Sequence, residues 1–198
     1  MDFKKIPNIL TIFRILLTPI FIILLFSDHH LAHSTALFIF ILASITDGVD
    51  GYYARKYNEI TKDGKFLDPL ADKILVSSAF ISFALLGIID FWMVGIITFR
   101  DMFITGLRWI ISNKGFEFVT SKLSKYKTAF QLTIIILTLI FLTLESFNME
   151  SFIPTIDLIK QYKIIYMLTL FTAIFTAYTG VIYLYANRFV IKDFIRNN

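Results

Sequence analysis

The chain of 198 residues contains no cysteine. Disulfide bonds, thiolate metal ligands and cysteine nucleophiles are therefore excluded, although the redox compartment is left open. The sequence also lacks internal repeats, low-complexity tracts and any stretch with the composition of a separate soluble domain. We therefore interpret residues 1–198 as one helical domain whose segments are joined by short connections.

Charge is also scarce, because charged residues make up 17% of the chain and the formal net charge is +4. So small an excess of basic residues gives no reason to expect a nucleic-acid partner. Hydrophobic residues account for 57% and aromatic residues for 17%. This composition lies outside the range of soluble globular proteins and predicts an integral membrane protein in contact with membrane lipids.

Long apolar runs divide the chain into segments of membrane-spanning length. A spanning helix needs about 20 mostly apolar residues, and six segments approach this length: 9–26, 34–55, 68–89, 91–111, 129–146 and 164–186. The first resembles a signal peptide, but it is long for one and no convincing cleavage site follows it, so we expect it to be retained. The sequence thus predicts an all-α, polytopic membrane protein with six transmembrane helices.

Basic residues fall mainly on one side of these predicted spans. With both termini inside, the inner loops and the tail hold Lys56, Lys62, Lys65, Lys114, Lys122, Lys125, Lys127, Arg188, Lys192 and Arg196. The outer connections hold only Lys160 and Lys163. Since Lys and Arg near helix ends collect on the cytoplasmic side, we expect a multi-pass protein of the cytoplasmic membrane with both termini facing the cytoplasm.

Four aspartates lie in the second and third predicted spans, where an ionised side chain costs at least about 2.5 kcal/mol at the bilayer centre. Asp47 and Asp50 are three residues apart in the second span, and Asp68 and Asp72 are four apart in the third. Residues at these spacings share a helix face. The two spans are joined by an inner loop, so we expect the four carboxylates to meet near the cytoplasmic surface.

These four carboxylates have two interpretations. They can pair with Arg55, Lys65 and Lys73 in structural salt bridges, or they can hold a divalent cation that relieves their mutual repulsion. All-oxygen coordination suits Mg²⁺ or Mn²⁺ better than Zn²⁺. Small residues leave space for a ligand beside them: Gly48, Gly51, Ala54 and Gly64. The spacing and this space favour the metal site.

The aspartates belong to a longer pattern. It consists of Asp47, Asp50-Gly51, Ala54-Arg55 and, after eight residues, Gly64, Asp68 and Asp72. With every defined position filled, this string resembles the signature of the CDP-alcohol phosphotransferases, whose six-helix membrane architecture agrees with the six predicted spans. The resemblance implies a metal-dependent enzyme that transfers a substituted phosphate group from a CDP-activated lipid to an alcohol.

Other segments resemble the bacterial phosphatidylglycerophosphate synthases of that family. They are residues 6–11 with Arg14 and Pro19, residues 66–73, Arg100 with residues 105–108, and residues 125–128 with Gln131. Two residues depart from the pattern, because Asp101 stands where Glu is expected and Ser124 where Gly is usual. The resemblance implies CDP-diacylglycerol as donor and glycerol 3-phosphate as acceptor, giving phosphatidylglycerophosphate and CMP in phospholipid biosynthesis.

The same resemblance implies a role for each candidate residue. Asp47, Asp50, Asp68 and Asp72 would hold two metal ions, and Asp72 would also be the catalytic base. Asn8, Thr11, Gly51, Ala54, Arg55 and Thr61 would bind the CDP-lipid, although Asn8 or Thr11 can instead cap the first helix. Arg100, Arg108, Lys125 and Lys127 would bind the phosphate of the acceptor. The family is commonly dimeric, so a homodimer is expected.

The arginines of the fourth span can also be interpreted from their spacing and their depth in the membrane. Arg100 and Arg108 are eight residues apart, which places them in one broad sector of an ideal helix. An arginine near mid-membrane requires an anion or a carboxylate to face it. Arg100 can therefore either form a salt bridge with Asp101 or the metal-site aspartates, or bind the acceptor phosphate together with Lys125 and Lys127 from the inner loop.

Two other functions compete with this interpretation. Buried carboxylates also mark ion pathways in transporters, but such proteins usually show broken helices or inverted repeats, and neither is visible in this sequence. Within the enzyme class, a sister activity would use serine, inositol phosphate or another acceptor. A neutral acceptor would leave the arginines and lysines without a phosphate to bind.

Overall fold

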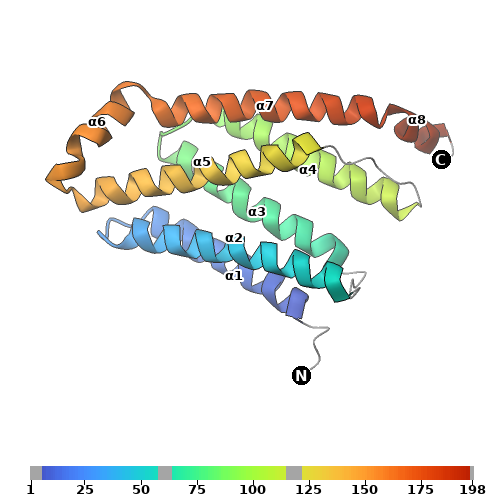
Figure 1. Ribbon diagram of the computed structural model, residues 1–198, viewed down its shortest axis with the longest axis horizontal. Coiled ribbons are helices and arrows are strands. Elements are labelled where there is room, and N and C mark those ends of the chain that lie inside the picture. Colours follow the sequence, from blue (N-terminus) through green and yellow to red (C-terminus); the bar gives the residue numbers. More distant parts are fainter. Residues whose placement is uncertain (1–5, 58–63, 115–121, 197–198) are drawn as a thin grey trace.

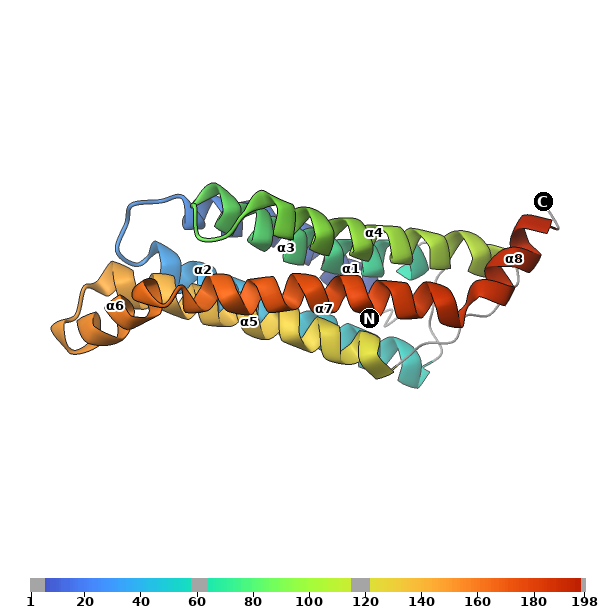
Figure 2. The same cartoon turned by 90° about the horizontal axis from the view of Figure 1, so that it is seen from above.

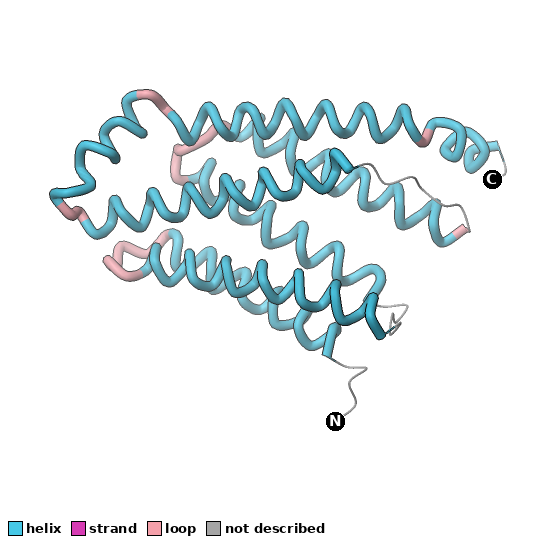
Figure 3. Tube along the Cα trace, in the orientation of Figure 1, coloured by secondary structure: helices cyan, strands magenta, loops and turns pink. Residues whose placement is uncertain are grey.

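The computed structural model describes residues 6–57, 64–114 and 122–196, and over these ranges it contains helices and no strand. The helices are α1 (Ile6–Leu25), α2 (Ala32–Tyr57), α3 (Gly64–Leu85), α4 (Phe91–Asn113), α5 (Lys122–Phe147), η2 (Glu150–Phe152), α6 (Ile153–Gln161), α7 (Ile164–Ala186) and α8 (Arg188–Arg196). The predicted all-α class is confirmed. Figure 3 shows how little of the described chain is loop.

Residues in the left-handed region mark several of the helix boundaries. After α3, Gly87 has φ +73, and the amides of Gly87 and Ile88 donate to the carbonyls of Ala84 and Phe83 at 3.0 Å each. This is the Schellman arrangement, in which glycine avoids the steric penalty of a side chain. Asn148 after α5 and Lys163 before α7 have φ values of 46° and 48°. These turns reverse the chain at one end of the bundle.

The six long helices form a closed ring. α1 packs against α2 and α3, α4 against α3 and α7, and α5 against α2 and α7. The order around the ring is therefore α1, α2, α5, α7, α4, α3, with an additional contact between α3 and α5. Figures 1 and 2 show these helices running along the long axis of the molecule, with α6 at one end and α8 at the other.

Apolar side chains occupy both the inside and the outside of this ring. Large residues from several helices are fully buried in one cluster that includes Phe21, Phe40, Phe80, Met93 and Ile135. Other large apolar residues, such as Phe38, Phe99, Ile174 and Val181, are exposed on the outer surface. An extended exposed apolar surface is typical of a protein that contacts lipid. Packing, rather than exclusion of water, then holds the helices together.

Two helices are long and apolar enough to cross a membrane by length and composition: Leu123–Phe147 in α5 and Ile164–Ala186 in α7. Shorter apolar stretches cover Ile12–Leu25 and Ala32–Thr46 among the described residues. The long helices coincide closely with the six predicted segments, and α7 has the predicted limits. The apolar helices indicate a membrane protein, whereas the six spans themselves remain a prediction.

The structure contains three short helices that the sequence analysis did not predict. Between α5 and α7 the chain forms η2 and the nine-residue α6, and after α7 it forms α8. A search for apolar runs of spanning length cannot find such short helices, which place apolar and polar residues on different faces. In addition, α5 begins at Lys122 instead of the predicted residue 129, because its first turns are polar.

Candidate active site

The two halves of the aspartate signature lie at the same end of the helix bundle. The C-terminal part of α2 carries Asp47, Asp50, Gly51, Ala54 and Arg55, and the first turns of α3 carry Asp68 and Asp72. Figure 1 shows the end of α2 and the start of α3 side by side at this end of the molecule. A metal site shared by the two helices requires that both halves of the signature lie at one end of the bundle, and the fold places them there.

Several predicted site residues lie outside the described residues. The side chains of residues 47–70, which include three of the four signature aspartates, are not described, and neither are those of Asn8 and Thr11 on α1. Thr61 lies outside the described backbone as well. The convergence of the four carboxylates and the composition of the CDP-lipid site therefore remain predictions.

Asp72 is the signature aspartate whose side chain is described. The ammonium of Lys73 donates to Oδ2 of Asp72 at 2.6 Å, and the two side chains are 22% (Asp72) and 15% (Lys73) exposed. This pair is one of the salt bridges that the sequence offered as an alternative. Among the described side chains, no three His, Asp or Glu residues gather in a metal-binding group. A partly accessible carboxylate can nevertheless exchange its lysine for another cation.

A second charged group is buried between α4 and α5, with Asp101 at its centre. The Asp101 side chain is 2% exposed and accepts hydrogen bonds from Arg100 Nη1 at 3.2 Å, from Gln131 Nε2 at 3.2 Å, and from the ammonium of Lys127, which is 1% exposed. Lys127 and Gln131 are four residues apart on α5 and so share a face. Asp101, which departs from the family pattern, thus contacts two residues predicted to bind the acceptor phosphate, Arg100 and Lys127. It also contacts Gln131, which belongs to a segment that resembles the family.

This buried cluster carries more positive charge and more donors than its carboxylate uses. One carboxylate faces the cations of Arg100 and Lys127, so the group retains a net positive charge. Within the described ranges, Nε and Nη2 of Arg100 and Oε1 of Gln131 are buried without a hydrogen-bond partner. Such groups are rarely left unsatisfied in native proteins. The two unused donors of Arg100 therefore suit the cluster to an anion that supplies acceptor oxygens, whereas Oε1 of Gln131 is itself an acceptor.

Lys73 connects the cluster to the signature. It pairs with Asp72 on α3, and it also lies close enough to interact electrostatically with Asp101 and Lys127. Since α3 packs against α4 and contacts α5, the three helices place Asp72 and the buried cations in one region. A phosphate bound at the cluster would lie near the carboxylate that the sequence predicts to be a base.

Helix α7 contacts both arginines of α4. A Cβ atom added to Gly180 would lie 3.0 Å from Cγ of Arg100, so the arginine stem occupies the space that a side chain would fill. Arg108 Nε donates to the hydroxyl of Tyr183 at 3.3 Å, and its guanidinium lies 5.7 Å from the centre of that ring. The two arginines therefore share one side of α4, as their spacing predicted.

Lys125 and Lys127 lie on a helix and not in the inner loop to which the sequence analysis assigned them. Both lie on α5, where two residues correspond to a rotation of about 200°. Lys127 points into the bundle and joins Asp101, whereas Lys125 is exposed on the other side of the helix. The structure thus brings together Arg100 and Lys127, places Arg108 nearby on α4, and leaves the role of Lys125 a prediction.

The sequence underestimated several residues of this region. Asp101 was considered as a departure from the family pattern and as a salt-bridge partner of Arg100, although a carboxylate in an apolar span is itself a signal of function. Tyr183 was not considered. Tyr183 is 1% exposed, and its contact with Arg108 spans 75 positions of the chain. No local pattern could have predicted a contact over that separation.

Comparison with known proteins agrees with the family resemblance. The family model described as CDP-alcohol phosphatidyltransferase matches residues 4–181. A Bacillus subtilis protein named CDP-diacylglycerol–glycerol-3-phosphate 3-phosphatidyltransferase is 41% identical over 143 residues, which are 66% of this chain and 74% of the relative. A Rickettsia typhi protein of the same name is 40% identical over 129 residues, or 65% of this chain and 72% of the relative.

A third relative, from Mycobacterium tuberculosis, is named probable phosphatidylglycerophosphate synthase. It is 39% identical over 114 residues, which cover 56% of this chain and 54% of the relative. The family match includes the signature aspartates, Asp101 and Gly180 on α7, and it ends before Tyr183. The chain belongs to the CDP-alcohol phosphatidyltransferase family.

Proposed function

We propose that this protein transfers a phosphatidyl group from CDP-diacylglycerol to sn-glycerol 3-phosphate, giving phosphatidylglycerophosphate and CMP in phospholipid biosynthesis. Family membership and the names of the similar bacterial proteins support the reaction class and both substrates. The observation that carries the choice of acceptor is the buried cationic cluster of Arg100 and Lys127, with its unused donors, near Asp72.

The acceptor assignment follows from the charge balance of this cluster. Glycerol 3-phosphate carries close to two negative charges at neutral pH and must approach a donor pyrophosphate and several carboxylates. Arg100 offers two buried donors beyond its bond to Asp101, and guanidinium forms paired hydrogen bonds with phosphate oxygens. A serine acceptor has no phosphate to use these groups, and an ion-transport function would not need them.

The donor site is assigned to the signature. Asp47, Asp50, Asp68 and Asp72 form an all-carboxylate donor set that fits Mg²⁺ or Mn²⁺, and two bound ions would neutralise the pyrophosphate and stabilise the departing CMP. Arg55 would contact a phosphate of the CDP group. The remaining CDP-lipid contacts are assigned to Asn8, Thr11, Gly51, Ala54 and Thr61.

In the proposed reaction the hydroxyl of the acceptor attacks the β-phosphorus of CDP-diacylglycerol. A new phosphorus–oxygen bond forms, the bond to the CMP oxygen breaks, and CMP leaves. The hydroxyl proton passes to the carboxylate of Asp72, which is accessible and is oriented by Lys73 at 2.6 Å. Arg100 and Lys127 would hold the acceptor phosphate, and Asp101 fixes both cations in place.

The membrane arrangement is also part of this proposal. We infer that α1, α2, α3, α4, α5 and α7 cross the cytoplasmic membrane, with both termini and the active site facing the cytoplasm, since the basic residues collect at that end. The exposed apolar surface of these helices supports contact with lipid. A homodimer is proposed on family resemblance.

The test is an acceptor panel with the purified protein in detergent. CMP release from CDP-diacylglycerol should require glycerol 3-phosphate and should not occur with serine, inositol or inositol phosphate. Release of CMP with serine or an inositol acceptor but not with glycerol 3-phosphate would show that the acceptor assignment is wrong. No CMP release with any acceptor, in the presence of Mg²⁺ or Mn²⁺, would contradict the proposed enzyme.

A further inference from the structure

A pocket of about 520 Å³ lies at the end of the bundle opposite the signature. It is lined by the start of α2, the turn between α3 and α4, the end of α5 and the segment from α6 to α7. His33 lines the pocket and precedes Asp47 by fourteen helical residues, which corresponds to about 21 Å along α2. This pocket is therefore separate from the proposed active site.

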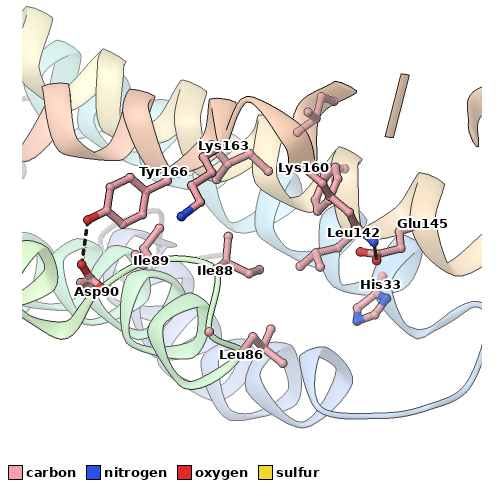
Figure 4. A pocket seen from close by; sticks show the side chains of 14 residues that line it. His33, Leu86, Ile88, Ile89, Asp90, Leu142, Glu145, Lys160, Lys163 and Tyr166 are labelled. Atoms are coloured by element: carbon pink, nitrogen blue, oxygen red, sulfur yellow. Dashed lines mark hydrogen bonds and ion pairs between the residues drawn. The ribbon is translucent and has the colours of Figure 1, made fainter. Parts of the chain in front are cut away.

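Most of the charged groups around the pocket already have partners. Asp90 accepts hydrogen bonds from the hydroxyl of Tyr166 at 2.7 Å and from Nε1 of Trp92 at 3.1 Å. Glu145 forms an ion pair with Lys160. Figure 4 shows the Tyr166–Asp90 hydrogen bond and the Lys160–Glu145 ion pair at the edge of the pocket. Lys160 therefore compensates the charge of Glu145, whereas Asp90 is held at the rim by two neutral donors and keeps its negative charge.

Lys163 is the exception. Its ammonium points into the pocket in Figure 4 and has no hydrogen-bond or ion-pair partner in the described part of the chain. Nδ1 of His33 is likewise buried without a partner among the described residues. Lys163 also adopts φ 48° and ψ 42°, a conformation that glycine or asparagine reaches more easily. An unpaired lysine at such a position offers its charge to a ligand.

The other walls of the pocket are apolar. Ile88, Ile89, Leu142, Ile159 and Ile165 line it together with Phe141. Its volume falls in the range of small-molecule sites, which combine apolar walls with a few placed polar groups. One cation beside an apolar wall matches an amphiphile whose anionic group adjoins its hydrocarbon part.

We propose that this pocket binds a phospholipid with an anionic headgroup, taken from the membrane leaflet opposite the active site. Lys163 contacts the headgroup phosphate, and the isoleucine-rich wall receives the adjoining acyl chain. The pocket lies beside the ends of α5 and α7, the two helices long and apolar enough to cross a membrane. The inference rests on the membrane placement proposed above and is independent of the reaction.

Trp92 provides a reporter for the test, since its indole contacts Asp90 at the pocket rim. The chain has two tryptophans, so Trp109→Phe leaves Trp92 as the only one. This variant is placed in phosphatidylcholine vesicles that contain a small fraction of phosphatidylglycerol brominated near the carbonyl end of its chains. The mole fraction of brominated lipid that half-quenches Trp92 should be about tenfold lower for phosphatidylglycerol than for equally brominated phosphatidylcholine, the effect of one charge-assisted contact on affinity.

Lys163→Asn should remove this preference. Asparagine tolerates the left-handed backbone, so the variant keeps its fold, and Lys163→Gly provides a second variant with the same backbone freedom. Lys192→Asn on α8, at the far end of the molecule, is the matched control and should leave the preference unchanged.

Equal quenching by the two brominated lipids, or an unchanged preference in both Lys163 variants, would overturn the proposal. Displacement by millimolar inorganic phosphate would show a site for free phosphate instead of a lipid, which also contradicts it. The measurement needs neither CDP-diacylglycerol nor glycerol 3-phosphate. Transfer activity assayed on the same Trp109→Phe protein therefore distinguishes failure of the lipid site from failure of the proposed reaction.

Discussion

Asp101 is 2% exposed and holds Arg100, Lys127 and Gln131, so the cost of its loss can be worked out from the structure. Asp101→Asn keeps the size of the side chain but leaves the ammonium of Lys127, which is 1% exposed, without a counter-charge. Removing one partner of a buried ion pair costs about 3–5 kcal/mol. The midpoint of thermal unfolding in detergent should therefore fall by roughly 6 °C or more.

The same substitution should also weaken use of the acceptor, because Arg100 and Lys127 lose the group that orients them. The KM for glycerol 3-phosphate should rise about tenfold or more, the effect of one charge-assisted contact, while the KM for CDP-diacylglycerol changes little. CMP release with each substrate varied in turn measures both. Asp101→Glu keeps the charge and should retain most of the stability and activity.

A second substitution separates stability from function. Adding Lys127→Met to Asp101→Asn removes the uncompensated charge and should recover much of the stability, but the acceptor KM should remain high. Lys125→Met, on the exposed side of the same helix, is the control and should leave the unfolding midpoint unchanged. If Asp101→Asn unfolds within about 2 °C of the unsubstituted protein, or if the double variant loses the sum of the single effects, the reasoning is refuted.

Three further predictions concern α7 and the metal site. Gly180→Ala puts a Cβ atom 3.0 Å from Cγ of Arg100 and should raise the KM for glycerol 3-phosphate severalfold, whereas Gly95→Ala, with nothing within 4 Å, should have no effect. An unchanged acceptor KM in Gly180→Ala would show that the arginine position is not critical. Tyr183→Phe removes the hydroxyl that accepts from Arg108 and should raise the same KM about two- to tenfold, as expected for a neutral hydrogen bond; equal changes in both substrates' KM values would indicate a general structural defect instead. EDTA should abolish CMP release and Mg²⁺ or Mn²⁺ should restore it, so undiminished activity in chelator would exclude the proposed metal dependence.

The long helices could be predicted because their apolar runs are continuous. Residues 164–186 were predicted as a span, and α7 has these limits. The start of α5 could not be predicted in the same way, since its first turns contain Lys122 and Lys125 and extend beyond the apolar run. The helices α6 and α8 have nine residues each and contain too few apolar positions to stand out.

The candidate site could also be predicted only in part. Spacing along one helix predicted that Arg100 and Arg108 share a side of α4, and both contact α7 in the structure. Contacts between helices were not accessible to that reasoning. Asp101 meets Lys127 across 26 positions, and only the packing of α4 near α5 decides that this carboxylate serves both lysine and arginine.

The ring order has a consequence for how the protein is made. Helices that follow one another in the chain pair as α1 with α2, α3 with α4, and α5 with α7. The signature is divided between the first and second of these hairpins, whereas Asp101 and Lys127 join the second to the third. In the proposed membrane arrangement, the second and third hairpins therefore carry ionisable residues, Asp101 and Lys127, whose partners belong to the other hairpin. A partly assembled protein would expose unpaired charge to lipid, which makes the functional residues themselves a driving force for completing the ring.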